Sequence, residues 1–252
     1  MYIIISPAKK MNINPDDFPV QNQPIFLKEA NQLMEIIQGL SIKETKELWQ
    51  CNDKLNELNY QRFQKMQQTQ PLTPAIMSYE GLQYQSINAD LMSQEQLDYL
   101  EKHLRILSGF YGILKPFDGV VPYRLEMQAK LQVSPLIKNM YQFWDEKLFQ
   151  ELANEKLIIN LASKEYSKAI TPYLNEQTTF LTISFASFCT DKRTGIRKAR
   201  AKATESKIAR GQMVRFMAEN QIETVERIKE FCDSGFSFNE ELSTADHFTF
   251  TK

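Results

Sequence analysis

The first residues in the chain that could do chemistry are Ser6 and Lys9, which follow the apolar run Tyr2–Ile5. Their S-x-x-K spacing is that of serine acyl-transfer enzymes, in which a helix brings the lysine close enough to deprotonate the serine. The S-D-N and K-T-G partner motifs of those enzymes are absent from this sequence. The alternative is that Ser6 caps a turn after a buried strand and that Lys9 lies at the carboxyl end of a sheet, where ligands of α/β proteins bind.

A second group of polar residues, from Lys164 to Tyr166, comes directly after another apolar run, Leu157–Leu161. If the two apolar runs are neighbouring strands, these side chains and Lys9 would meet at one edge of the sheet and could bind an anion. The alternative is that Tyr166 packs in the core and Lys164 is solvated. The pocket predicted by this reasoning is lined by the following residues: Ser6, Lys9, Arg124, Glu126, Lys164 and Tyr166.

The segment from His103 to Pro116 predicts a helix, a tight glycine turn and a second short helix, which is the outline of a helix-hairpin-helix. In such a hairpin, backbone N–H groups bind a phosphate without reading the base sequence. Gly109 and Gly112 would form the turn, with Arg105 and Lys115 on either side. The glycines are three positions apart instead of the usual two, so a plain helix–helix corner is the alternative.

Arg124 follows a loop that Pro116 and Pro122 stiffen. Such a loop would hold the arginine at the rim of a binding site. The alternative is an ion pair between Arg124 and Glu126 that only ties the loop down.

The strongest local charge lies between Asp191 and Arg215, where nine basic residues and two acids give about +7. On a helix, four of the cations would fall within an arc of about 80°: Arg197, Arg200, Lys207 and Arg215. A cationic face of this kind can bind nucleic-acid phosphates by releasing counterions. The stretch from Glu219 to Asp246 carries eight acids and two basic residues, so pairing of the helix with this acidic stretch is an equal alternative.

Composition limits the remaining functions. The 252 residues include 30 Lys and Arg and 31 Asp and Glu, with a net charge of -1, so the chain as a whole does not attract polyanions. Three distant cysteines and two histidines predict neither a disulfide framework nor a metal site, and no cofactor motif is present. Without a basic n-region or an apolar run of about 18 residues, we expect a cytoplasmic protein with no membrane partner.

These candidate residues need a scaffold of strands and helices. Strands are predicted at 2–5, 75–79, 157–161, 179–185, 236–238 and 248–250. Helices are predicted at 25–38, at 41–68 with a capping box at Ser41 and Glu44, at 93–108, up to residue 220 and at 223–232. No repeat or linker divides the chain. The predicted fold class is α+β: a single compact domain over residues 1–252, with a mixed β-sheet, surrounding helices and a helix-hairpin-helix-like segment.

Several segments, in order along nearly the whole chain, resemble the YaaA family of bacterial cytosolic peroxide-stress proteins. The matching segments are 4–9, 53–62, 103–115, 122–127, 141–144, 159–166 and 209–216. The resemblance implies a single α and β domain, binding of double-stranded or branched DNA, and a role in keeping intracellular iron low so that iron-driven damage to DNA is limited. The chain departs from the family pattern at Ile208, where a lysine is common, and between Phe185 and Lys207.

Two functions follow as expectations. The first is a peroxide-stress protein that binds the DNA backbone non-specifically. Its contacts would be Lys9, Arg105, Gly109, Gly112, Lys115, Arg124, Lys164, Arg197, Arg200, Lys207 and Arg210. The second is an enzyme that uses the small basic pocket described above on an anionic metabolite. The two differ in whether the cations lie along an open groove or converge in a cavity narrower than a duplex.

Overall fold

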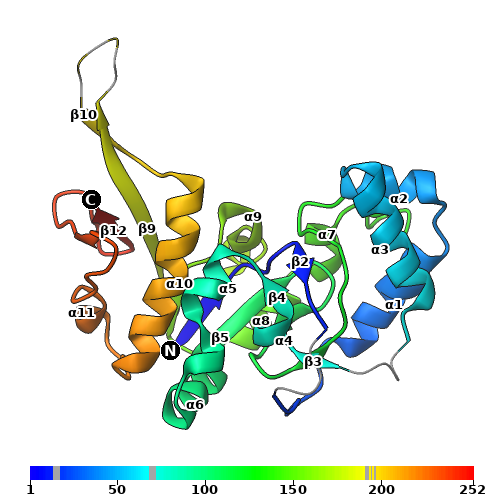
Figure 1. Cartoon of the computed structure of the whole chain (residues 1–252), viewed down its shortest axis with the longest axis horizontal. Helices are drawn as coiled ribbons and strands as arrows, with labels where there is room; N and C mark the ends of the chain where they lie inside the picture. Colours follow the sequence, from blue (N-terminus) through cyan, green and yellow to red (C-terminus); the bar gives the residue numbers. More distant parts are fainter. Residues whose placement is uncertain (14–17, 68–71, 191–192, 194, 196) are drawn as a thin grey trace.

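The computed structural model describes residues 1–13, 18–67, 72–190, 193, 195 and 197–252 (Figure 1). Its sheet is built around a central strand, β1 (Tyr2–Ile5). Ile3, Ile4 and Ile5 are fully buried, as expected for a strand covered on both faces. β1 pairs in parallel with β5 (Leu104–Ser108) on one side and with β8 (Leu157–Asn160) on the other. The predicted first strand and the predicted strand at 157–161 are therefore confirmed as neighbours.

The described residues form an eight-stranded sheet with the order β11-β12-β9-β8-β1-β5-β6, and β10 pairs with β9. The long strand β9 (Thr179–Thr190) and β12 (His247–Thr251) continue the parallel part of the sheet. Three strands run antiparallel to their neighbours: β6 (Gly112–Leu114), β10 (Arg197–Arg200) and β11 (Ser237–Phe238). The sheet is mixed, so the predicted α+β class with one compact domain is confirmed.

Three helices, α1 (Leu27–Gln38), α2 (Ile42–Trp49) and α3 (Asp53–Lys65), form a group on the right of Figure 1. The capping box of Ser41 and Glu44 forms as predicted. The single helix expected at 41–68 is instead two helices, because Gln50 adopts a left-handed conformation (φ 45°) and Asn52 caps a new helix.

The remaining elements lie around the sheet. Short strand pairs join β2 (Lys10–Met11) to β4 (Tyr79–Glu80) and β3 (Thr73–Pro74) to β7 (Gly119–Val120). The other helices are α4 (Ala75–Ser78), α5 (Leu82–Ile87), α6 (Gln94–His103), α7 (Met140–Trp144), α8 (Lys147–Leu152), α9 (Lys164–Ser167), α10 (Ala203–Glu219) and α11 (Val225–Ile228). The strand expected at 75–79 is wrong: the backbone there makes one helical turn, and the N–H groups of Ala75 and Ile76 bond to the 116–118 loop instead of to a ladder.

The helix-hairpin-helix expected between residues 103 and 115 is also wrong. α6 ends at His103, and the chain continues as β5, a tight turn and antiparallel β6, with Ser108 opposite Gly112. Leu104, Ile106 and Leu107 are all fully buried. Burial on both faces of a strand produces a continuous apolar run, which helical spacing also fits, so the periodicity does not distinguish the two.

The basic stretch is not one helix either. Arg197 and Arg200 lie on β10, which pairs with the last four residues of β9 and projects from the body of the molecule (Figure 1). The helix begins only at Ala203, so Arg197 and Arg200 do not share a helical face with Lys207 and Arg215. Lys192, which was counted in this stretch, lies outside the described residues.

No helix within the described part of the chain is both long and apolar enough to cross a membrane. Within the same residues, no three His, Cys, Asp or Glu side chains gather in a way that could hold a metal ion.

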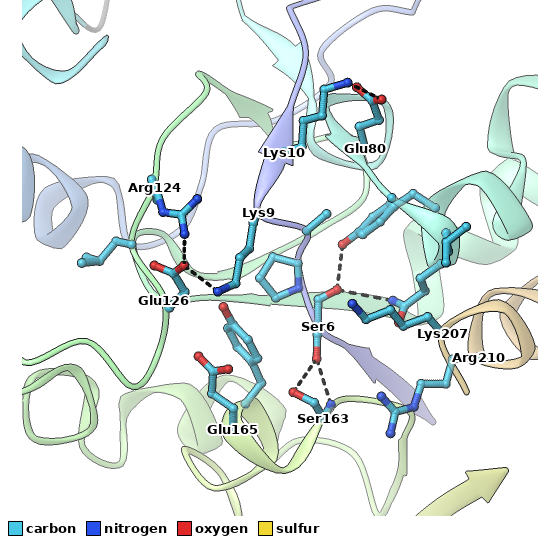
Figure 2. A pocket seen from close by; sticks show the side chains of 18 of the residues that line it. Ser6, Lys9, Lys10, Glu80, Arg124, Glu126, Ser163, Glu165, Lys207 and Arg210 are labelled. Atoms are coloured by element: carbon cyan, nitrogen blue, oxygen red, sulfur yellow. Dashed lines mark hydrogen bonds and ion pairs between the residues drawn. The ribbon is translucent and has the colours of Figure 1, made fainter. Parts of the chain in front are cut away.

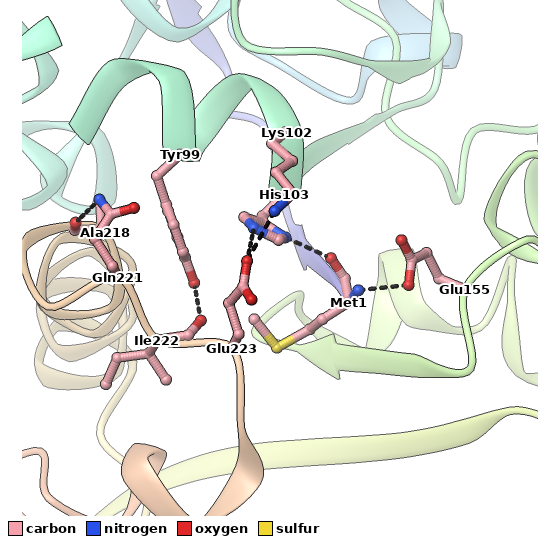
Figure 3. Close-up of polar contacts among 9 residues, drawn as sticks. All are labelled: Met1, Tyr99, Lys102, His103, Glu155, Ala218, Gln221, Ile222 and Glu223. Carbon is pink, nitrogen blue, oxygen red and sulfur yellow. Dashed lines mark hydrogen bonds and ion pairs between the residues drawn. The ribbon is translucent and has the colours of Figure 1, made fainter. Parts of the chain in front are cut away.

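The buried imidazole of His103 joins α6 to the start of β1 and to the segment after α10 (Figure 3). Its Nδ1 lies 2.8 Å from the carbonyl oxygen of Met1, and its Nε2 lies 3.4 Å from Oε1 of Glu223. Burial lowers the pKa of His103 below its ordinary value near 6.5. The neutral ring therefore donates its Nδ1 proton to Met1.

This histidine predicts a pH dependence of stability. Because the pKa in the folded state is lower than in the unfolded state, the unfolded chain takes up the proton first, and stability falls as the pH drops below about 6.5. Urea unfolding at pH 7.5 and at pH 5.5 measures the effect. Between these two pH values, the free energy of unfolding should fall by more in the wild-type protein than in His103→Gln. Equal losses in the two proteins would contradict this assignment.

Candidate functional site

The order in which successive strands are added to the sheet reverses between β1 and β8. Numbered along the chain, the parallel strands have the order 2-1-3-4-5, with β5 and β8 on opposite sides of β1. At such a switch point the connections leave the sheet in opposite directions, so a crevice opens beyond the carboxyl ends of the two strands. We call the cavity found there the switch-point pocket.

A pair of serines closes the base of this pocket. The backbone N–H of Ser163 donates to Oγ of Ser6 at 2.8 Å, and Oγ of Ser6 donates to Oγ of Ser163 at 3.2 Å (Figure 2). The carbonyl of Ser6 accepts from the Tyr84 hydroxyl (3.0 Å) and from Nε2 of Gln83 (3.3 Å), both on α5. Ser163 occupies the N-cap position of α9, but its side chain makes no capping bond.

The pocket has a volume of about 490 Å³ and is lined from five parts of the chain. These are the segments Ser6–Lys10, Glu80–Tyr84 and Tyr123–Glu126, the start of α9, and Lys207 and Arg210 of α10. Five of the six residues predicted for a small basic pocket lie here: Ser6, Lys9, Arg124, Glu126 and Tyr166. Lys164 is exposed and does not line the pocket. Volume and shape fit a small molecule and not a duplex.

Two cations neutralise Glu126. Nζ of Lys9 and Nη2 of Arg124 each lie 3.0 Å from its Oε1. The side chains of Arg124 and Glu126 are only 9% and 11% exposed, and Nε of Arg124 is buried without a hydrogen-bond partner. The predicted Arg124–Glu126 ion pair therefore exists, and it is also part of the pocket wall.

The S-x-x-K pattern does not form a serine–lysine pair. Residues 6–9 are not helical, Lys9 contacts Glu126, and Ser6 bonds to Ser163. The helical geometry that lysine-assisted acyl transfer requires is absent from this segment, so that interpretation is wrong. The alternative, in which Lys9 lies beyond the carboxyl end of a buried strand, is confirmed.

The wall formed by α10 carries the uncompensated positive charge. Within the described part of the chain, Lys207 and Arg210 have neither an ion pair nor a side-chain hydrogen bond, whereas Arg215 on the same helix pairs with Glu219 at 2.7 Å. Burial lowers the pKa of Arg210, which means that its charge lacks the solvation it would have in water. The acidic stretch after residue 219 does not neutralise these two cations.

Three buried tyrosines line the pocket. Tyr84, Tyr123 and Tyr166 are buried, and burial raises the pKa of Tyr123 to about 12. The Tyr123 hydroxyl lies 2.7 Å from that of Tyr79 and 2.6 Å from Oγ of Ser108. At neutral pH these phenols are protonated, so they contribute hydrogen bonds and shape but no charge.

Arg105 and Lys115, predicted to hold phosphates, lie elsewhere. Both line a separate cavity beside Tyr2, at the amino end of β1, and this cavity shares no lining residue with the switch-point pocket. Arg105 stacks 4.3 Å from the Tyr2 ring centroid and donates to backbone carbonyls, and Lys115 faces Glu101 at 3.8 Å. The expected cations therefore do not all gather in one strip.

Gly109 and Gly112, the expected phosphate-binding glycines, are both buried. A Cβ on Gly109 would lie 2.4 Å from the carbonyl oxygen of Leu125. Gly112 has φ +74°, and a Cβ there would lie 2.7 Å from the Trp144 ring. Both glycines permit close packing, and Gly109 in particular lets the Tyr123–Glu126 segment reach the pocket.

Sequence reasoning missed Ser163 and Glu80 as residues of the site, and it placed Glu165 after the second buried strand without including it among the pocket residues. Ser163 and Glu165 follow β8 as Ser6 follows β1, so the argument that selected Ser6 also applied to them. Glu80 enters the site through the β2–β4 pairing, where it bonds to Lys10 and Asn12, and no local pattern indicates that contact.

The fold and the cavity define an α+β protein with a pocket rich in basic residues at the switch point of its parallel strands. The chain belongs to the YaaA family: a family model described as peroxide stress protein YaaA matches residues 1–242. Similar curated proteins, each named UPF0246 protein, occur in Lactiplantibacillus plantarum (50% identity over 99% of this chain and 98% of the relative) and Pediococcus pentosaceus (46% over 100% and 98%). Another, in Lachnoclostridium phytofermentans, is 47% identical over 100% of this chain and 96% of the relative.

The position of Lys207 and Arg210 depends on Gly211, and this dependence can be tested. A Cβ on Gly211 would lie 2.1 Å from the carbonyl oxygen of Gln83. At this point α10 therefore packs directly against the backbone of α5, with no room for a side chain. Helix propensity alone would make Gly211→Ala more stable by about 1 kcal/mol. We expect it to be less stable by about 2 kcal/mol, because the helices must separate.

Denaturant unfolding measures the effect of Gly211→Ala, with Gly39→Ala as the matched control. Gly39 has φ −77°, and its nearest neighbour to a Cβ is at 3.4 Å, so the control should change stability by less than about 1 kcal/mol. A stabilised Gly211→Ala protein would contradict the close contact between α10 and α5.

Proposed function

We propose that the chain is an enzyme that acts on a small anionic metabolite held in the switch-point pocket. The observation that carries this proposal is the pair Lys207 and Arg210, which line the pocket without a partner in the described chain. Arg210 is partly buried and Lys207 is exposed at the pocket wall, and cations next to hydroxyl groups favour a phosphate or carboxylate because charge-assisted hydrogen bonds are strong. Ser6 and Ser163 supply those hydroxyl groups.

The pocket also contains side chains that could transfer protons to or from a bound substrate. Glu126 and Glu165 line the same pocket as candidate acids or bases, and Ser6 is a candidate hydrogen-bond donor. Membership of a family named for peroxide stress supports a role for the reaction during oxidative stress.

Removing Arg210 tests the proposal. In calorimetric titration with inorganic phosphate, Arg210→Ala should bind at least about tenfold more weakly than wild type, since a charged hydrogen bond contributes about 1.5 kcal/mol or more. Arg215→Ala removes the same charge from the same helix outside the pocket and should bind as wild type does. Equal binding by both variants would refute the role of Arg210.

A second proposal, implied by the family resemblance, is non-specific binding of the DNA backbone that limits iron-driven damage. The observation that favours it is the exposed row Arg197, Lys198 and Arg200 on projecting strand β10, which leads directly into α10 and Lys207 (Figure 1). Arg197 also stacks 4.5 Å from the centroid of the Phe188 ring. A basic strand of this kind suits phosphates and carries no base recognition.

Salt dependence tests this second proposal. The logarithm of the duplex-binding constant should fall linearly with the logarithm of salt concentration, and changing Arg200 and Lys207 together to Glu should abolish binding at 0.15 M salt. Fluorescence anisotropy with a labelled duplex measures both effects. Flat salt dependence, or binding retained by the double variant, would exclude the basic strand as a DNA contact.

A further inference from the structure

Three carboxylates line the switch-point pocket, and they differ in their partners. Glu80 bonds to Lys10 at 2.5 Å and to Asn12 at 2.7 Å, and Glu126 is held by Lys9 and Arg124. Glu165 has no cation within ion-pair distance among the described residues. Its carboxylate faces backbone N–H groups, accepting from Gln128 at 3.3 Å. It is therefore the one pocket carboxylate in the described chain that has neither an ion pair nor a hydrogen bond with a side chain.

Glu165 lines the same pocket as the two cations of the proposed anion site. Glu165 lies two residues after Ser163, and in Figure 2 the Ser163 side chain lies between it and Arg210. Lys207 and Arg210 attract an anion into the same cavity that Glu165 lines. An anion bound in this cavity would therefore meet both these cations and a carboxylate that has no ion pair.

An ionised carboxylate only accepts hydrogen bonds, so it repels an oxyanion with no proton and binds one that has a proton to donate. Hydrogen phosphate and phosphate monoanions carry such a proton, whereas sulfate carries none between pH 5 and 8. We propose that Glu165 makes the switch-point pocket selective for a protonated oxyanion, a phosphate instead of a sulfate. This inference rests on the proposed function and narrows its ligand class to oxyanions that keep a proton at neutral pH, such as inorganic hydrogen phosphate.

The surroundings of Glu165 agree with this role. Burial raises the pKa of Glu165, and the nearby charge of Glu126 adds to that effect, while Lys9 and the N–H groups of Met127 and Gln128 oppose it. Tyr141 of α7 donates to the backbone carbonyl of Glu165 at 2.9 Å and fixes the residue in place. A carboxyl group with a raised pKa readily shares a proton with a bound phosphate.

Parallel titrations of the full chain with inorganic phosphate and sodium sulfate, at constant ionic strength and pH 7.5, test the selectivity. Wild type should bind phosphate at least about tenfold more tightly than sulfate, because sulfate leaves the carboxylate unpaired. In Glu165→Gln the amide can donate to sulfate, so sulfate affinity should rise and the ratio should fall towards one. Glu151→Gln, which removes a carboxylate from the cavity at the other end of β1, should keep the wild-type ratio.

A pH series on the wild-type protein is an independent measurement that needs no variant. Because the pKa of Glu165 is raised by burial, the protonated fraction of this carboxyl increases as the pH falls from 7.5 towards 5, and sulfate affinity should increase with it. Similar affinities for phosphate and sulfate in wild type, or a ratio unchanged in Glu165→Gln, would overturn the selectivity and leave the anion site standing. If neither anion binds the wild type, the proposed function fails and the selectivity fails with it.

Discussion

The parallel pairing of β1 on both sides is the constraint on which the rest of the site depends. With β5 on one side and β8 on the other, the chain must leave the sheet in two directions at one point, and no backbone fills the space between. Ser6 and Ser163 therefore meet, although 157 positions separate them, and the hydrogen bonds between them join the carboxyl ends of the two strands. Every other group in the pocket is placed relative to this junction.

Two close backbone approaches then bring the walls of the pocket to their places. Gly109 allows the Tyr123–Glu126 segment to pass against the turn between β5 and β6, and Gly211 allows α10 to touch α5. The first wall carries Arg124 and Glu126, which neutralise one another, and the second carries Lys207 and Arg210, which have no partner in the described chain. The pocket is therefore positive on one side, even though the chain as a whole has a net charge of -1.

Much of the scaffold was predictable from local pattern. The apolar runs at 2–5 and 157–161 are strands, the capping box at Ser41 starts a helix, and residues after the two buried strands do line a common site. The prediction failed where one pattern fits two structures. The spacing of Leu100, Leu104 and Leu107 suits a helix, but Leu104 and Leu107 belong to a strand buried on both faces. Gly109 and Gly112 were predicted to contact a phosphate, but the atoms packed closely around them show that they are needed for packing.

The amino-acid sequence by itself determined which segments are buried, where several helices begin, and that Ser6, Lys9 and Tyr166 lie near the ends of strands. These properties depend on residues close together in the chain, whose spacing carries the information. Only the tertiary structure decided which cations share a cavity, which carboxylates are neutralised, and that Arg105 and Lys115 lie at the opposite end of β1. Those outcomes depend on contacts between segments far apart in the chain, because the charge a ligand meets is set by the neighbours that folding brings together.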